Sequence, residues 1–224
     1  MMNDLSHNSI TNVTNIWQYQ VHVWKGMNDN ITMPEHEGTR YILSLDASIH
    51  TDTINMGGLQ CNALQTNCKS PWAKLHKQTS TVVDIRFSGL NLNEESMYVT
   101  DGLTTGNLSY MDGGTNSNAI SPPRAGLPVV NYTHFPAKMS QTLHTHPSQR
   151  IGLVLNGHGE IELDNHKHFR LEKGSVFFME RNTLHNFITH DEDVTLFVFA
   201  PDSGTGPTDE VNPLKVRTYV GQQR

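Results

Sequence analysis

Residues 144–157 read HTHPSQRIGLVLNG, and this stretch carries the strongest structural signal in the chain. His144 and His146 are one residue apart, and side chains at that spacing on an extended segment point to the same side. A proline ends the segment, and an apolar run from Ile151 to Leu155 then stops at a turn-forming Asn-Gly pair. The stretch predicts two histidines that face one way, followed by a buried strand.

A second block, GSVFFMERNTLHNF at residues 174–187, supplies a third histidine, His185. Seven of the 13 histidines fall between His144 and His190, which raises the expectation of metal chemistry in this part of the chain. Three imidazoles that are brought together form a compact set of ligands for a divalent transition metal ion. His144, His146 and His185 are therefore candidate ligands of a metal centre.

The part of the chain that surrounds these blocks has a regular pattern from residue 127 onward. Short apolar segments alternate with turn residues, and Asp164-Asn165 fits a hairpin turn between two alternating runs. Even spacing of short strands with tight turns predicts an antiparallel barrel or jelly roll. Residues 201–224 have the composition of a loop that packs on the outside.

The N-terminal part of the chain is harder to interpret. Strand candidates lie at residues 17–24, 40–47 and 54–63, each close to turn-forming Asp, Asn or Gly residues. We expect residues 1–75 to form a β-rich N-terminal extension, with a degenerate copy of the same β module left open, and residues 76–224 to form the barrel and its tail.

The first part of the predicted barrel contains one clear strand and one long loop. Residues 81–87, TVVDIRF, are rich in β-branched side chains and predict a strand. Residues 101–126 are rich in Gly, Asn, Ser and Pro, and this composition predicts a loop.

Composition narrows the function classes. With 224 residues, 17% of them charged, and a formal charge of −6, the chain offers no broad basic surface for nucleic acid or an anionic membrane. It has no long apolar run for a transmembrane helix, and its polar N-terminus lacks an apolar signal core, so we expect a cytoplasmic protein. Cys61 and Cys68 match no common zinc spacing, and we expect them to be reduced and structural.

The two histidine blocks resemble the motifs of the cupin superfamily. Its first motif is His-x-His, three or four residues, Glu, six residues and Gly, and its second is Gly, five residues, Pro-x-Gly, two residues, His, three residues and Asn. The matching positions here are His144, His146, Gly157, Gly174 and His185, whereas Glu180, Asn182 and Thr189 replace the Pro, Gly and Asn of the second motif. The resemblance covers about residues 129–200 and implies an all-β, cupin-type antiparallel jelly-roll barrel in which the three histidines bind the metal.

The sequence departs from the cupin pattern where the family supplies a Glu ligand, because Arg150 stands there with Gln149 before it. Arginine cannot ligate a metal, and a guanidinium ~5 Å from a dication would be repelled by about 6–7 kcal/mol at an effective dielectric constant of ~20. Three arrangements are open: Arg150 points away and pairs with a carboxylate, it holds a substrate carboxylate in the pocket, or it supplies the positive charge without a metal. Gln149 is a weaker candidate ligand, because alternation favours Arg150 on the face of the histidines.

A metal held by three neutral imidazoles keeps its +2 charge and favours an anionic partner. Related cupins with three-histidine iron sites are often dioxygenases, so the resemblance implies Fe(II), O₂ and a small anionic substrate oriented by Arg150 or Gln149, although zinc, manganese or nickel also suit such a site. This is our leading prediction. Two alternatives stay open: a non-oxidative isomerase or lyase that uses the metal as a Lewis acid, and a non-catalytic ligand-binding cupin.

The remaining expectations concern other histidines and assembly. His134 alternates with Tyr132 before the first motif and is a candidate acid or base that faces the cavity. The resemblance also implies a homodimer, since cupins often pair through β edges or exchanged strands. Four further histidines are expected at the surface: His158, His166, His168 and His190.

Overall fold

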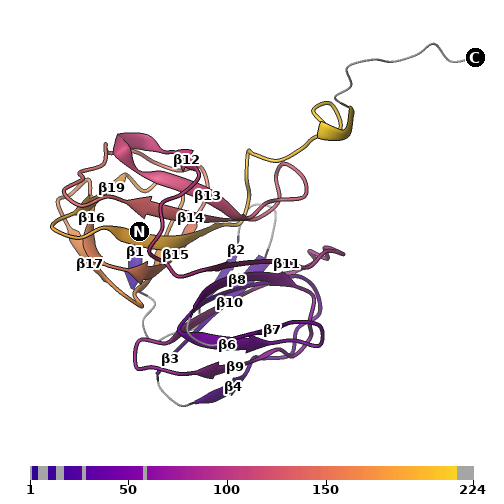
Figure 1. The fold of residues 1–224 in the computed structure, drawn as a ribbon. Helices are drawn as coiled ribbons and strands as arrows, with labels where there is room; N and C mark the ends of the chain where they lie inside the picture. Colours follow the sequence, from indigo (N-terminus) through magenta and orange to yellow (C-terminus); the bar gives the residue numbers. More distant parts are fainter. Residues whose placement is uncertain (1, 5–9, 14–17, 27–28, 58–59, 216–224) are drawn as a thin grey trace, which may run out of the picture.

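The computed structural model describes residues 2–4, 10–13, 18–26, 29–57 and 60–215, which form two antiparallel β-sandwich halves (Figure 1). We call residues 10–100 the N-terminal half, and residues 108–200 together with the first strand the C-terminal half. Each half pairs one large sheet with one small sheet. The predicted all-β class and jelly-roll architecture are confirmed.

The N-terminal half contains a six-stranded and a four-stranded sheet. The large sheet has the order β11 (Ser96–Thr100), β8 (Cys61–Thr66), β5 (Arg40–Leu45), β10 (Thr81–Ser88), β3 (Gln18–Lys25) and β2 (Ile10–Val13). The small sheet has the order β4 (Asn30–Thr32), β9 (Trp72–Leu75), β6 (Ala47–His50) and β7 (Asn55–Met56). The single strand predicted at residues 54–63 is divided, because β7 pairs with β6 whereas β8 pairs with β5.

The C-terminal half contains a seven-stranded and a three-stranded sheet. The large sheet has the order β1 (Met2–Asp4), β18 (Val176–Met179), β15 (Arg150–Asn156), β20 (Val194–Ala200), β14 (Val129–Phe135), β13 (Thr115–Ile120) and β12 (Leu108–Ser109). The small sheet has the order β17 (His168–Glu172), β16 (His158–Leu163) and β19 (His185–Thr189), with the predicted Asp164-Asn165 turn between β16 and β17.

Two short 3-10 helices, η1 (Met111–Gly113) and η2 (Pro213–Lys215), complete the elements. In the described ranges, no helix has the length and apolar character of a membrane span.

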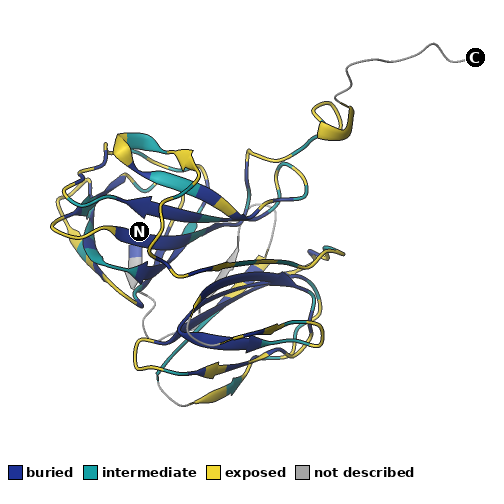
Figure 2. Ribbon diagram, viewed as in Figure 1, coloured by how far each residue is buried: buried dark blue, intermediate teal, exposed yellow. Residues whose placement is uncertain are grey.

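The two large sheets face each other across a shared apolar core. Strand β15 shows how alternation builds it: Ile151 and Leu153 are fully buried in the cluster that also contains Tyr19 and Phe87 of the N-terminal half. Val154, one position further on, belongs instead to the separate core of the C-terminal half. Figure 2 shows the facing sheets as mostly buried strands. Side chains of alternate residues of β15 thus pack into two different cores. A binding site inside the C-terminal half can use only the side chains on the face that points into that half.

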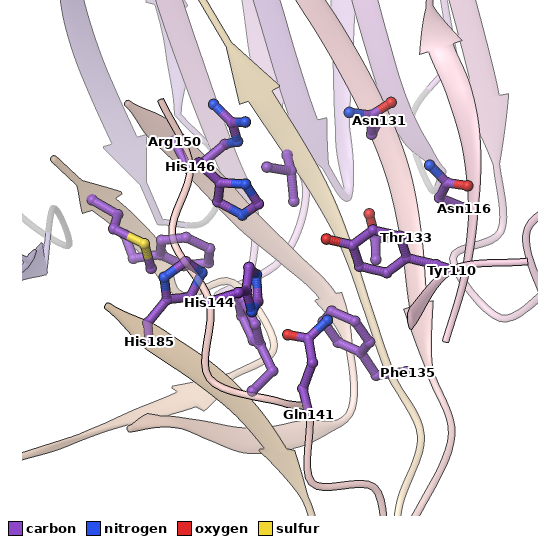
Figure 3. A pocket seen from close by; sticks show the side chains of 14 residues that line it. Tyr110, Asn116, Asn131, Thr133, Phe135, Gln141, His144, His146, Arg150 and His185 are labelled. Carbon is purple, nitrogen blue, oxygen red and sulfur yellow. The ribbon is translucent and has the colours of Figure 1, made fainter. Parts of the chain in front are cut away.

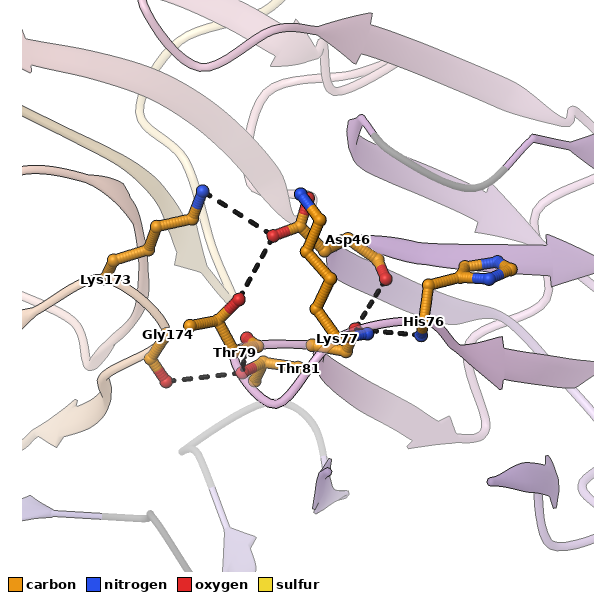
Figure 4. A network of polar contacts seen from close by, with 8 residues as sticks. Asp46, His76, Lys77, Thr79, Thr81, Lys173 and Gly174 are labelled. Atoms are coloured by element: carbon orange, nitrogen blue, oxygen red, sulfur yellow. Dashed lines mark hydrogen bonds and ion pairs between the residues drawn. The ribbon is translucent and has the colours of Figure 1, made fainter. Parts of the chain in front are cut away.

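A polar contact at Asp46 joins the two halves (Figure 4). Its buried carboxylate accepts hydrogen bonds from Lys77 Nζ at 3.1 Å and Thr79 Oγ1 at 3.2 Å, and lies 3.5 Å from Nζ of Lys173 in the turn between β17 and β18. Beside it, Thr81 Oγ1 donates to the carbonyl oxygen of Gly174 at 3.4 Å. Because both lysines are about half exposed, each ion pair contributes little energy, but together these contacts fix where that turn meets the N-terminal half.

Strand β13 lies inside the stretch at residues 101–126 that was predicted as a loop, and this prediction was wrong in part. Its register with β14 runs from Thr115 opposite His134 to Ile120 opposite Val130. The strand begins with the polar residues TNSN, so the alternation of apolar side chains that signals a strand is absent.

Sheet pairing also bears on where the halves divide. Strands β10 and β11 follow the boundary expected at residue 75, yet they pair with β3, β5 and β8. The pairing groups residues up to Thr100 with the N-terminal strands.

Candidate metal centre

The structure brings the three predicted histidines together (Figure 3). His144 lies on the extended segment before β15, and His185 is the first residue of β19. The two residues form an isolated antiparallel bridge with backbone N–H to O distances of 3.0 Å in both directions. With His146, their ring nitrogens lie within 4.8 Å of one another.

Hydrogen bonds fix the tautomer of two of these rings. His144 Nδ1 lies 2.8 Å from the carbonyl oxygen of Thr142, and His185 Nδ1 lies 2.8 Å from that of Thr183. A carbonyl oxygen only accepts hydrogen bonds, so each Nδ1 carries the proton and donates it. The Nε2 atoms are left with free lone pairs, which is the arrangement of a metal-ligating histidine.

The surroundings keep two of the three histidines, His146 and His185, neutral. Burial, with smaller contributions from Arg150 and the other two rings, lowers the pKa of His146 to about 3. Burial likewise lowers the pKa of His185 to about 4, against the opposing effect of its hydrogen bond to Thr183. Metal binding requires unprotonated imidazole, and both rings have that form at neutral pH.

The histidines line a cavity of about 230 Å³. Figure 3 shows a polar wall facing them, with the labelled side chains of Tyr110, Asn116, Asn131 and Thr133. Among the described residues that line the cavity, Arg150 is the single charged side chain and no carboxylate is present. The cavity therefore has a positive electrostatic character even before a metal ion is counted. The apolar lining is Phe135, Phe177, Met179, Phe187 and Val198.

Arg150 faces this cavity. Its Nη1 donates to the carbonyl oxygens of Ser148 and Gln149 and to the Ser148 hydroxyl at 2.6–3.1 Å, and no ion pair joins it to a carboxylate in the described part of the chain. Burial lowers its pKa, opposed mainly by the nearby charge of Asp202. Of the three arrangements that the sequence left open, the one with Arg150 turned away into an ion pair is therefore not observed.

The other two predicted site residues lie outside the cavity. Gln149 Oε1 accepts a hydrogen bond from Tyr19 OH at 3.3 Å, so this side chain points toward the N-terminal half. His134 Nε2 lies 3.0 Å from Asp193 Oδ2, on the opposite face of β14 from the cavity-lining Thr133. Alternation along an extended chain explains both placements, because Gln149 precedes the inward Arg150 and His134 follows the inward Thr133.

The remaining histidines and the cysteines are where they were expected. The four exposed histidines contact surface carboxylates, and Cys61 and Cys68 are buried and free. The contacts are His158 with Glu192, His166 with Glu162, and both His168 and His190 with Glu160.

Sequence reasoning missed the polar wall. Asn131 and Thr133 alternate with buried residues of β14, and this alternation is a signal that could have placed them on the face opposite Tyr132. Asn116 carries no such signal, because β13 begins with the polar residues TNSN and lacks the alternation of apolar side chains.

Comparison with known families agrees with this geometry. The family model of the cupin domain matches residues 131–200, the stretch that contains all three histidines. Residues 131–200 are therefore identified as a cupin domain. The match covers less than half of the chain, and no curated protein sequence matches it.

Several solved structures resemble the chain over both of its halves. A cupin 2 conserved barrel domain protein from Leptotrichia buccalis is 16% identical and aligns over 87% of this chain and 88% of its own, with a TM-score of 0.55. AerE from Microcystis aeruginosa is 14% identical over 89% and 96%, with a TM-score of 0.57. A mutant salicylate 1,2-dioxygenase from Pseudoaminobacter salicylatoxidans, in complex with gentisate, is 11% identical over 83% and 68%, with a TM-score of 0.55. At these identities the likeness shows the fold.

Proposed function

We propose that the protein is a metal-dependent enzyme that acts on a small anionic substrate, with His144, His146 and His185 as the metal ligands. The observation that carries the proposal is the convergence on one cavity of three imidazoles and an arginine that has no carboxylate partner among the described residues. Perturbed ionisable groups that line a cavity together are typical of active sites.

The donor set fits a divalent transition metal. Two of the rings present Nε2 because their Nδ1–H groups are already bonded to carbonyl oxygens, and imidazole nitrogen suits iron, zinc, nickel and copper. Three neutral ligands leave the charge of the ion uncompensated, so an anionic substrate is favoured. When bound, an iron(II) ion would supply the redox chemistry that activates dioxygen.

The protein's own groups bind and orient the substrate in this proposal. Arg150 attracts a carboxylate and holds it through the planar donors of its guanidinium, a geometry that lysine lacks. Asn116, Asn131 and Thr133 offer neutral hydrogen-bonding groups on the opposite wall, and Phe177 contributes to an apolar lining that excludes water.

Within this class we infer an Fe(II) dioxygenase. Support comes from the three-histidine donor set and from the fold shared with a salicylate 1,2-dioxygenase. A non-oxidative isomerase or lyase is the second candidate, favoured by Tyr110. Its hydroxyl group lies in the cavity wall that faces the histidines, where it can hold or release a proton (Figure 3).

The first experiment is elemental analysis of the purified protein beside two variants. We expect about one iron per chain in the wild type, loss of that iron in His144→Ala, and retention in His158→Ala, a matched change at a surface histidine. Screening of the iron-loaded protein with small carboxylic acids should then show O₂ uptake. Turnover without O₂ in a zinc- or manganese-loaded protein would favour the isomerase or lyase. A wild-type protein that takes up no metal even on reconstitution would refute the proposal.

We also propose a homodimer in the cytoplasm, which rests on the sequence alone. A mass near twice the 25.1 kDa of one chain, measured by light scattering, is the expected outcome.

A further inference from the structure

Gln141 is a cavity-lining residue whose side-chain amide has no hydrogen-bond partner among the described residues. Its backbone N–H donates to the carbonyl oxygen of Phe187 at 2.9 Å, which holds this segment against β19. The side chain lines the same cavity as the three histidines and is 2% exposed. Its amide oxygen and its amide nitrogen are both buried, and neither forms a hydrogen bond within the described residues.

An amide in this state is energetically unfavourable. Leaving a buried donor or acceptor unsatisfied destabilises a protein by about 1–3 kcal/mol, and most buried polar groups are paired for that reason. Leucine has nearly the same size and would avoid this penalty. An unpaired glutamine beside a cavity is therefore better explained by what the cavity binds than by the stability of the fold.

The position of Gln141 gives the cavity two chemically different ends. In Figure 3 its amide points into the cavity between His144 and Phe135, whereas Arg150 lies beside His146 on the other side. The Arg150 end is cationic and the Gln141 end is neutral, with one acceptor atom and one donor group. A ligand that satisfies both ends carries a carboxylate and, away from it, an uncharged hydroxyl group.

We propose that Gln141 is the specificity-determining residue that recognises a hydroxyl group on a small carboxylic acid held by Arg150. This inference rests on the proposed function and narrows its substrate class to hydroxylated carboxylic acids. An acid that lacks the hydroxyl leaves the amide unpaired when it binds, and sites built to hydrogen-bond a substrate group discriminate strongly against such analogues.

Two pairs of probe acids that differ by one hydroxyl group test the proposal: gentisate against salicylate, and malate against succinate. Dissociation constants are measured by calorimetry on metal-loaded wild type and on Gln141→Leu. We expect the wild type to prefer the hydroxylated member of at least one pair by 10-fold or more. Gln141→Leu should lose that preference, bind the deoxy acid with unchanged affinity, and unfold at the same temperature as the wild type or higher.

Gln65 provides a matched control. It is also a buried glutamine, but its Nε2 donates to the carbonyl oxygen of Glu94 at 2.9 Å, far from the cavity. Gln65→Leu should therefore lower the unfolding temperature and keep the hydroxyl preference, the reverse of the result expected for Gln141→Leu.

Several outcomes would overturn the inference: no preference in either pair, binding of none of the four acids, a preference that persists in Gln141→Leu, or destabilisation of that variant. Metal analysis separates this failure from failure of the proposed function. A protein that takes up metal but shows no hydroxyl preference would refute the role of Gln141 alone. The reverse result is also informative. If the wild type takes up no metal but prefers the hydroxylated acid, and Gln141→Leu loses that preference, the role of Gln141 stands and the metal-dependent enzyme is refuted.

Discussion

The two halves of the molecule share one strand order and differ in what their interiors hold. The order β8-β5-β10-β3-β2 in the N-terminal half corresponds to β18-β15-β20-β14-β13 in the C-terminal half, and β9-β6-β7 corresponds to β19-β16-β17. The strands also follow one another along the chain in the same sequence. The N-terminal half thus repeats the strand topology of the C-terminal half.

An arginine begins the same strand in each half, but the two arginines have different partners. Arg40 begins β5 and is fully buried, with Nε 3.7 Å from Asp84 Oδ1, while Arg86 Nε lies 3.5 Å from Asp84 Oδ2. Arg150 begins β15 and has carbonyl and hydroxyl oxygens as its bonded partners. The charge of Arg40 is compensated within the protein, whereas that of Arg150 is available to a ligand.

The histidine positions differ in the same way. His36 precedes Arg40 by four residues, as His146 precedes Arg150, but its Nε2 contacts the carbonyl oxygen of Phe87 at 2.7 Å. Trp72 begins β9 where the corresponding strand begins with His185. The fold supplies only the positions of these residues in the two halves. The side chains at those positions determine whether a metal can bind.

The largest expected effect on stability comes from removing Asp84, the buried acid between Arg40 and Arg86 in the N-terminal half. Asp84→Ala leaves Arg40 and Arg86 buried without a countercharge, and breaking a buried ion pair in this way costs about 3–5 kcal/mol. Urea unfolding of the metal-free protein measures the loss. Replacing all three residues with apolar ones should restore part of the stability, and a triple variant less stable than Asp84→Ala would contradict this account.

Exchanging each arginine for methionine separates their roles. Arg40→Met removes one of the two partners of the buried Asp84 and should destabilise the protein by about 2–3 kcal/mol. Arg150→Met leaves none of the described carboxylates without its ion-pair partner, so it should change the free energy of unfolding by less than about 1 kcal/mol. It should weaken gentisate binding at least 10-fold. Equal destabilisation by the two changes would assign Arg150 a structural role.

The metal-free C-terminal half should be sensitive to acid. His185 has a pKa of about 4 in the folded protein, below the ordinary value of 6.5, so the unfolded chain takes up a proton first as pH falls. His185 alone should therefore lower folding stability by about 1 kcal/mol per pH unit from pH 6.5 toward pH 4.5, and His146, with a pKa of about 3, should add to this loss. Unfolding at several pH values should show a smaller slope in His185→Gln and an unchanged slope in the surface control His168→Gln, and an unchanged slope in both would contradict the assignment.

The smallest effect concerns Asp202, the acid whose charge acts on Arg150 without forming an ion pair. Asp202→Asn removes the negative charge that partly offsets the charge of Arg150. Gentisate should therefore bind about 2–5-fold tighter at low salt. The gain should disappear at high ionic strength because the interaction is screened. A gain that is independent of salt would point to a steric cause.

Much of the C-terminal half was predictable because its signals are local. Strand alternation, the hairpin turn and the spacing of three histidines all depend on neighbouring residues, and the structure agrees with each of them. Gln149 and His134 lie outside the cavity because a shift of one position along an extended segment reverses the direction of a side chain. Alternation with His144 and His146 gave the direction of Arg150, whereas the direction of His134 became clear only from the folded sheet.

The amino-acid sequence was enough to indicate the all-β class, the cupin motifs and the candidate metal ligands. Each of these is visible in the spacing between residues that are close together along the chain. Folding established the rest by bringing distant segments together. In the part of the chain that the structure describes, the amide of Gln141 is unpaired and Arg150 has no carboxylate partner, while Asn116 faces the histidines. These properties depend on which side chains surround a group in space, and the identity of a residue and its neighbours in sequence do not specify that.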